Sequence, residues 1–360
     1  MRILDRYIGK TLLGKTFMAL LALVALFAFF SLIDQLEETG KGRYGVLQAI
    51  EYVLLTVPRL TYELFPIAAV IGSMAALGLL LKTNELAVMR TAGISQIQIA
   101  YALCKAGLVL IVITIVIGEL IAPVCEQTAQ HRRSVAMTEQ ITLKTKYGFW
   151  SRDGNSYINI RKILPGDRVE EIYIYEFDDE EQLRSSTYAK DAEYVDGRWL
   201  LHNIEQTRLY EDNVTKYNMK SAAWDAFLDP DVINLVTIKP DYLSLWGLFN
   251  YIGYLSQNGQ NSMRYEQALW SKIINPLSII AMILLAIPIV KTGSKVSSIG
   301  QKVFTGALIG ILFHIGDQIS GHLGIVYGFN PFISVTMPTL LLITIVGFLL
   351  LKNRYSLFLH

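Results

Sequence analysis

The sequence predicts an α-helical membrane protein with six transmembrane helices, three on each side of an inserted all-β domain. Two observations predict this fold. Hydrophobic residues make up 52% of the 360 residues and charged residues only 18%, and the mean hydropathy is +0.37. Charge is also unevenly placed, because residues 126–242 hold 21 of the 31 acidic side chains. Such a composition argues against a disordered chain and makes a simple soluble enzyme unexpected.

Six apolar segments have the length of about 20 residues that a helix needs to cross a bilayer. The first is too long for a cleaved signal peptide and has no A-x-A cleavage site, so we expect it to remain as an anchor. The segments cover residues 16–33, 60–81, 97–121, 268–290, 303–323 and 332–351. They divide the chain into a first membrane half (1–122), a β domain with connectors (123–266) and a second membrane half (267–360).

Basic residues predict the orientation of these spans. The N-terminus, the C-terminus and the two short loops on the same side carry eleven Lys or Arg, including Lys82, Lys291 and Lys295, against two acidic residues. The opposite short loop, 34–59, carries three basic and four acidic residues. The positive-inside rule therefore places both termini in the cytoplasm and exports residues 123–266, in a bacterium to the periplasm.

The exported segment reads as short β-strands. In IYIYEF (172–177), Tyr173, Tyr175 and Phe177 alternate with Ile172 and Ile174. Hairpin turns are predicted at 153–154 and 196–197, both Asp-Gly, with TYAKDAEYV and RWLLHNIEQTRLY flanking the second as partners. A sandwich or jelly-roll fits, and its interior is either an ordinary filled core or a groove for an apolar ligand.

One phosphate-binding pattern is present and is expected to be accidental. Residues 9–16, GKTLLGKT, match G-x-x-x-x-G-K-[ST], but no strand precedes them and Lys15 runs directly into the first span. We therefore expect any ATP to be bound by another chain and no cofactor by this one. The sequence shows no catalytic triad and no metal-ligand cluster.

The second cytoplasmic segment has a small amphipathic helix that Asn84 can begin and Gly93 can end. Leu86, Met89 and Arg90 form one face beside Glu85. The helix is either a surface that docks on a cytoplasmic partner or a plain connector.

Span five has small and polar residues along one stripe, and an acid within a membrane must face protein or water. The stripe is either a cavity-lining or moving face, with Asp317 inward, or a static packing face. Its members are Gly306, Gly310, His314, Asp317, Gly321 and Gly324. Near the outer boundary, Arg59 precedes span two's apolar core, and Arg132 and Arg133 follow span three. These two arginines either hold phosphate or carboxylate groups of a lipid or are simply solvated.

Together these motifs resemble the lipopolysaccharide-export permeases of the LptF/LptG family, in particular its LptG branch. The resemblance covers nearly the whole chain. It is carried by LDRYIGK (4–10), IDQL (33–36), NELAVMRTAGIS (84–95), GELIAP (118–123), LSLWGLFNYIGYL (243–255), RYEQALWSKIINPLS (264–278) and DQI (317–319).

The resemblance implies a non-catalytic permease subunit of an ATP-driven lipopolysaccharide exporter in the bacterial inner membrane. It implies LptF as heterodimer partner, a dimer of the ATPase LptB below, and LptC and LptA as the bridge above. Lipopolysaccharide would enter from the outer leaflet through a lateral gate of spans one and five. The helix at 84–93 would be the coupling helix, and Arg59 and Arg133 would contact lipid phosphates.

One stretch departs from the family pattern, because Ser31, Glu37 and Glu38 stand where relatives carry lysines. Lys41 and Arg43, slightly further along, are possible substitutes. Two rival functions remain open on the residues alone. One is an intramembrane lipid-modifying enzyme that uses Asp317 and His314. The other is an envelope-lipid receptor, for which the cytoplasmic parts are short.

Overall fold

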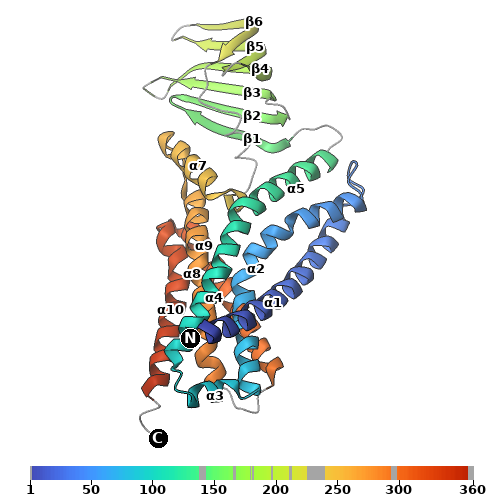
Figure 1. Cartoon of the computed structure of the whole chain (residues 1–360). Helices are drawn as coiled ribbons and strands as arrows, with labels where there is room; N and C mark the ends of the chain where they lie inside the picture. The colour runs from blue at the N-terminus through green and yellow to red at the C-terminus, as the bar shows by residue number, and fades with distance from the viewer. Residues whose placement is uncertain are drawn as a thin grey trace.

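The computed structural model has a long helical bundle with one antiparallel sheet stacked on its end (Figure 1). It describes residues 2–137, 143–164, 168–178, 180, 182–195, 198–210, 213–224, 240–292 and 298–355. Both the predicted turn at Asp196-Gly197 and the orienting residue Lys295 lie outside these ranges. The small helix α3 lies at the end of the bundle opposite the sheet (Figure 1).

The helices of the bundle contain all six predicted spans. Six helices of the described chain are long and apolar enough to cross a membrane, which confirms the predicted helical membrane fold. Most extend beyond the apolar core that predicted them. The first half consists of α1 (Arg2–Glu37), α2 (Val46–Lys82), α3 (Glu85–Thr91), α4 (Gln96–Val116), the π-helical turn η1 (Ile117–Ile121) and α5 (Ala122–Met137). The second half consists of the short turn η2 (Pro240–Tyr242), α7 (Leu245–Gln257), α8 (Met263–Thr292), α9 (Ile299–Tyr327) and α10 (Pro331–Tyr355).

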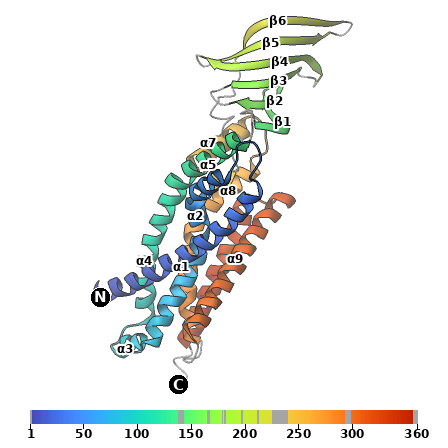
Figure 2. The same cartoon turned by 90° about the vertical axis from the view of Figure 1, so that its right-hand side faces the viewer.

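Helix α2 is the central helix of the bundle and α1 is the least covered. In the most apolar stretch of each, 83% of the α2 residues are buried but only 11% of those of α1. Helix α1 crosses the bundle obliquely (Figure 2). At its closest approach to α2 there is no room for a side chain at Gly72, since a Cβ there would lie 2.3 Å from Thr16 Oγ1. Much of α1 therefore presents apolar side chains outward, among them Phe17, Leu21 and Phe30.

The phosphate-loop pattern at residues 9–16 lies within the continuous helix α1. A phosphate-binding loop needs consecutive backbone N–H groups that are free to point at one anion. Inside an α-helix these groups bond to carbonyls one turn earlier. Residues 9–16 therefore do not form a phosphate-binding loop in this structure.

The β domain is an up-and-down sheet in which neighbours in sequence are neighbours in space. Ile172 and Ile174 are buried on one face, whereas Tyr173 and Tyr175 lie on the other, as the alternation predicts. The predicted turn at Asp153-Gly154 is confirmed, because Asp153 pairs with Ser156 and Gly154 has φ +56°. The strands are β1 (Leu143–Asp153), β2 (Ser156–Leu164), β3 (Arg168–Phe177), β4 (Leu183–Val195), β5 (Arg198–Leu209) and β6 (Val214–Trp224).

The all-β character of the insert is confirmed, and the predicted partner strands around residues 196–197 do pair, with Val195 opposite Arg198. The described strands make one sheet, so the second sheet of a sandwich or jelly-roll is not among them. The buried face of this sheet has its own apolar cluster, which includes Ile158, Ile172 and Trp199.

Candidate functional site

A cavity of about 620 Å³ lies at the sheet-facing end of α2 and α5. The loop after α1 and the first turns of α2 form one side of its wall, and the last turns of α5 form the other. The loop is held against α5, because Arg43 N–H donates to the Ala136 carbonyl at 2.7 Å. The lining residues are Arg43, Tyr44, Gln48, Glu51, Tyr52, Leu55, Ala129, His131, Arg132, Arg133, Val135 and Ala136.

Arg133, one of the basic residues that line this cavity, has unused hydrogen-bonding capacity. Its guanidinium carbon lies 5.2 Å from the centroid of the Tyr52 ring. Its Nε is buried and has no hydrogen-bond partner in the described part of the chain. Burial raises the pKa of the neighbouring Tyr44, and the positive charge of Arg133 acts in the opposite direction. A buried guanidinium N–H without an acceptor suits an anionic oxygen of a ligand.

Arg132 and Lys41, by contrast, are paired within the chain. Arg132 forms an ion pair with Glu51, and Lys41 forms one with Glu38. The Lys41 ammonium also lowers the pKa of Glu38. Lys41 is therefore partly neutralised by Glu38. Of Lys41 and Arg43, only Arg43 is among the residues that line the cavity.

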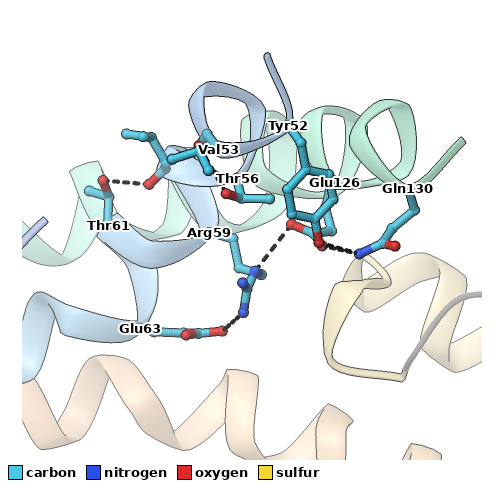
Figure 3. Close-up of polar contacts among 9 residues, drawn as sticks. Tyr52, Val53, Thr56, Arg59, Thr61, Glu63, Glu126 and Gln130 are labelled. Carbon is cyan, nitrogen blue, oxygen red and sulfur yellow. Dashed lines mark hydrogen bonds and ion pairs between the residues drawn. The ribbon is translucent and has the colours of Figure 1, made fainter. Parts of the chain in front are cut away.

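Arg59 is engaged with carboxylates instead of the cavity (Figure 3). It donates to Glu63 at 2.9 Å and to Glu126 at 3.1 Å, and thereby joins α2 to α5. The Glu126 side chain is only 1% exposed. Its other oxygen accepts from Gln130 at 2.9 Å. An arginine held this way would have to release a buried carboxylate before it bound a lipid phosphate, which is costly.

Tyr242, in η2, closes this cluster on the side of the returning chain. The Arg59 guanidinium carbon lies 5.1 Å from its ring centroid. Burial raises the pKa of Tyr242 to about 12. The cluster thus fastens the segment that leaves the β domain to both α2 and α5. The sequence analysis placed Arg59 near the predicted outer boundary of the membrane. It did not identify Glu126 as its partner, because Glu126 lies 67 residues away in the sequence.

A second ion pair lies at the end of the third span. Glu119, in the π-helical turn η1, binds Lys272 of α8 at 2.8 Å. The other Glu119 oxygen accepts the backbone N–H of Leu245, at the start of α7, at 2.6 Å. Glu119 therefore joins three segments that are far apart in sequence. The lysine inside the fourth apolar span, Lys272, was the signal that could have predicted such a partner.

The stripe on α9 is a packing face over most of its length. A Cβ at Gly306 would lie 3.1 Å from Met74, and one at Gly310 would lie 3.0 Å from Ile67, both on α2. At the other end, Gly321 lies against Gln267 of α8 and Gly324 against Ser334 of α10.

Between these contacts, His314 and Asp317 are half-exposed. The Nε2 atom of His314 lies 3.1 Å from the Nε2 atom of Gln318, one turn later on the same helix. No group of three or more His, Cys, Asp or Glu side chains in the described residues is arranged to hold a metal ion.

The predicted docking segment does form a short helix, α3, and Gly93 follows it with φ +86°. Asn84 precedes it with φ +60° and makes no side-chain capping bond, so its contribution is the turn and not a cap. Leu86 and Met89 are buried against the bundle. Glu85 is half-exposed and accepts a hydrogen bond from Thr83 at 2.8 Å, while Arg90 is exposed.

The structure therefore separates the four predicted residues of this segment into two groups. Leu86 and Met89 fix the helix to α2 and its neighbours, and Glu85 and Arg90 remain accessible from outside. The outward side of α3 also exposes Val88, which is 64% accessible.

The chain matches known proteins over nearly its full length. The family model described as lipopolysaccharide export system permease LptF/LptG matches residues 6–352. A Haemophilus influenzae protein named lipopolysaccharide export system permease protein LptG is 35% identical, with 98% of this chain and 99% of that protein covered. A protein of the same name from Escherichia coli K12 is 36% identical, with 94% of each chain covered.

Proposed function

Because the chain belongs to the LptF/LptG family of lipopolysaccharide export permeases, we propose that it is the LptG-type subunit of an ATP-driven exporter. In this proposal it carries no catalytic residue and sits in the bacterial inner membrane with both termini in the cytoplasm. Residues 1–122 and 267–360 form the two membrane halves, and residues 123–266 form the periplasmic part. It takes lipopolysaccharide from the outer leaflet and passes it toward the outer membrane.

The observation that carries this proposal is the basic cavity beside a poorly covered helix. The cavity offers Arg133, with an unsatisfied buried N–H, and Arg43 to an anion. The apolar side chains of α1 exposed next to it suit acyl chains. A lipid with phosphates at one end and acyl chains at the other would match both features at once. Arg132 and Arg59 would contribute indirectly, because their ion pairs with Glu51 and Glu126 hold α2 and α5 together beside the cavity.

The lateral gate would use α1 and α9, which both pack on α2. The outward side of α1 would face a second permease chain, LptF. Small residues on α9, including Gly310 and Gly321, keep that helix close to its neighbours. Close packing by glycines is what a gate helix needs if it is to slide or tilt as a rigid unit.

Energy would enter through α3 from a dimer of the ATPase LptB, which binds the ATP. Glu85 and Arg90 would contact the ATPase, while Leu86 and Met89 would carry its movement into the bundle. The change in the bundle would be a population shift toward a collapsed cavity that no longer holds the lipid. The sheet would then deliver the lipid to a bridge of LptC and LptA.

A photo-crosslinking experiment tests the proposed path. A benzophenone amino acid replaces Phe30 on α1, which is 54% exposed, or Val112 on α4, which is 60% exposed, in cells that make lipopolysaccharide. We expect lipopolysaccharide adducts at residue 30 in clear excess over residue 112, and fewer of them when purified complex is given ATP. Equal adduct yields at the two positions would show that α1 meets only bulk membrane lipid and would overturn the proposal.

A further inference from the structure

Helix α7 is an uncharged helix with one fully packed face. Its sequence, LWGLFNYIGYLSQ, contains no Asp, Glu, Lys or Arg. Leu248, Tyr251 and Leu255 are buried, with exposures of 4% or less. The Tyr251 ring centroid lies 4.5 Å from that of Tyr265 on α8. This face therefore accounts for the attachment of α7 to the bundle.

The opposite face of α7 exposes two large aromatic side chains beside Asn250 and Gln257, and nothing in the described chain covers it. Trp246 is 73% exposed and Phe249 is 64% exposed. Their rings stack on each other with centroids 6.4 Å apart. A helix that exposes a stacked aromatic pair on the side away from its packed face is expected to place that pair in a second apolar environment, because a contiguous aromatic patch is unfavourable in water.

The start of α7 is fixed at the end of a membrane span. The Leu245 N–H donates to Glu119, which lies where the third apolar stretch ends, and Glu119 in turn pairs with Lys272. The helix lies at the sheet-facing end of the bundle (Figures 1 and 2). Its first turn is therefore held at the end of a span by a hydrogen bond to a carboxylate that is itself fixed to α8.

Other aromatic side chains surround the same end of the bundle. Tyr327, at the end of α9, stacks with Phe329 at a centroid distance of 5.9 Å. Trp270 of α8 packs edge-on against Phe332 of α10 at 4.8 Å. Aromatic residues gather where the hydrocarbon core of a bilayer meets the headgroups. These pairs lie at the sheet-facing end of the bundle, as α7 does (Figure 1).

We propose that α7 lies in the plane of the outer membrane boundary and inserts Trp246 and Phe249 among the lipids. The proposed occupant of its exposed face is the lipid surface, because that face continues the boundary of the adjoining spans and carries no charge for a polar partner. Helix α7 would thereby tie the connection between the sheet and α8 to the membrane surface. This inference requires only that the chain is a membrane permease and is independent of its substrate.

Spin-label accessibility tests the proposal on the full chain in phospholipid nanodiscs. The two cysteines, Cys104 and Cys125, are first replaced by alanine. A label is then placed by Phe249→Cys, and two matched labels are placed at side chains of similar exposure. Val214→Cys, 67% exposed on the sheet, is the water reference, and Leu312→Cys, 60% exposed on α9, is the lipid reference. Collisions with dissolved oxygen report lipid, and collisions with a nickel chelate report water.

We expect the label at residue 249 to collide with the nickel chelate several-fold less often than the label at residue 214. Its oxygen collisions should approach those at residue 312. As an independent measurement, Trp246→Phe should remove a fraction of the tryptophan fluorescence that shallow brominated lipids quench. A label at 249 that behaves like the one at 214 would overturn the proposal. A label protected from both reagents would also overturn it, since another protein would then cover the face.

Discussion

Arg132 and Arg133 are neighbours in sequence, but their guanidinium groups have different surroundings. Arg132 pairs with Glu51 at the surface, with side-chain exposures of 60% and 41%. Arg133 lies over Tyr52, and its buried Nε has no acceptor in the described part of the chain. Of these two neighbouring arginines that line the cavity, Arg132 therefore has its charge balanced by a carboxylate, whereas Arg133 keeps a buried N–H without an acceptor in the described chain.

The two arginines should differ when each is changed to glutamine. Arg133→Gln should weaken lipopolysaccharide binding by about tenfold or more, because a hydrogen bond to a charged group contributes about 1.5–3 kcal/mol. Arg132→Gln should change affinity several-fold less, since its charge is already used by Glu51. Titration of purified complex in nanodiscs with lipopolysaccharide measures both. Equal losses for the two variants would contradict a specific role for Arg133, and unchanged binding in both would exclude the cavity as the phosphate site.

The Glu119–Lys272 ion pair should contribute much more to stability than an exposed pair of similar geometry. In Glu119→Gln the Lys272 ammonium, whose side chain is 7% exposed, loses its charged partner. Loss of one member of a buried pair costs about 3 kcal/mol. The control is Lys105→Gln, which breaks the pair with Asp5 at 2.7 Å and 48% exposure and should cost less than about 1 kcal/mol.

Thermal unfolding in detergent measures both changes. The double variant Glu119→Gln/Lys272→Met should recover part of the loss, because no unpaired charge remains. If Glu119→Gln unfolds at the same temperature as the parent, water must replace the lost carboxylate, and the pair does not contribute to stability as a buried pair would.

The helices were predictable from sequence because each depends on local composition. The apolar length of about 20 residues is sufficient to find a span, whatever the span packs against. The same holds for the hairpin at Asp153-Gly154, which depends on a left-handed residue in a two-residue turn. The alternation of Ile172 and Ile174 with tyrosines likewise identifies the buried face of β3 without knowledge of its partners.

The polar contacts between helices at the sheet-facing end of the bundle could not be predicted in the same way, because each joins residues far apart in sequence. Arg59 was expected at a lipid, yet its two carboxylate partners include Glu126 on another helix. Nothing local distinguishes Arg59 from Arg133. The inward orientation of Leu86 and Met89 was equally hidden, since both faces of so short a helix carry apolar residues and only the position of the bundle decides which face is buried.

If α3 docks on an ATPase as proposed, reversal of charge on α3 should uncouple that ATPase while leaving the chain inserted. Glu85→Lys keeps Leu86 and Met89 in their packing sites, so α3 should stay attached to the bundle. A partner surface that is complementary to the Glu85 carboxylate would then face a positive charge. A like-charge contact at an interface costs several kcal/mol. We expect normal membrane levels, ATPase activity without transport or loss of ATPase binding, and failure to support growth.

The control for this change is Thr83→Val, which removes the hydroxyl that donates to Glu85 but keeps the carboxylate. It should support growth. Full complementation by Glu85→Lys would remove the coupling role from this residue. Failure of both variants would point to the turn before α3 instead of the carboxylate.

Two glycines on α9 allow the packing stripe to be tested within one helix. Gly310 lies against α2, where a Cβ would meet side chains of Ile67 and Val70 at 3.0 and 3.2 Å and the Ile67 Cα at 3.3 Å. Gly316, six residues later, has open space where a Cβ would lie, with no neighbouring atom within 4 Å, and can accept a side chain freely. Valine at either position changes the helix propensity equally, so any difference reports packing.

Gly310→Val should therefore force α9 away from α2, at a cost of about 1–3 kcal/mol, and should impair transport. Gly316→Val should retain the unfolding temperature and the transport rate of the parent. Cross-linking between cysteines on α2 and α9, together with lipopolysaccharide release from purified complex, measures spacing and transport in the same samples. If both variants transport normally, the close approach of α9 to α2 is not needed for the cycle. If Gly310→Val is stable yet does not transport, the stripe acts in movement of the helix and not merely in its attachment.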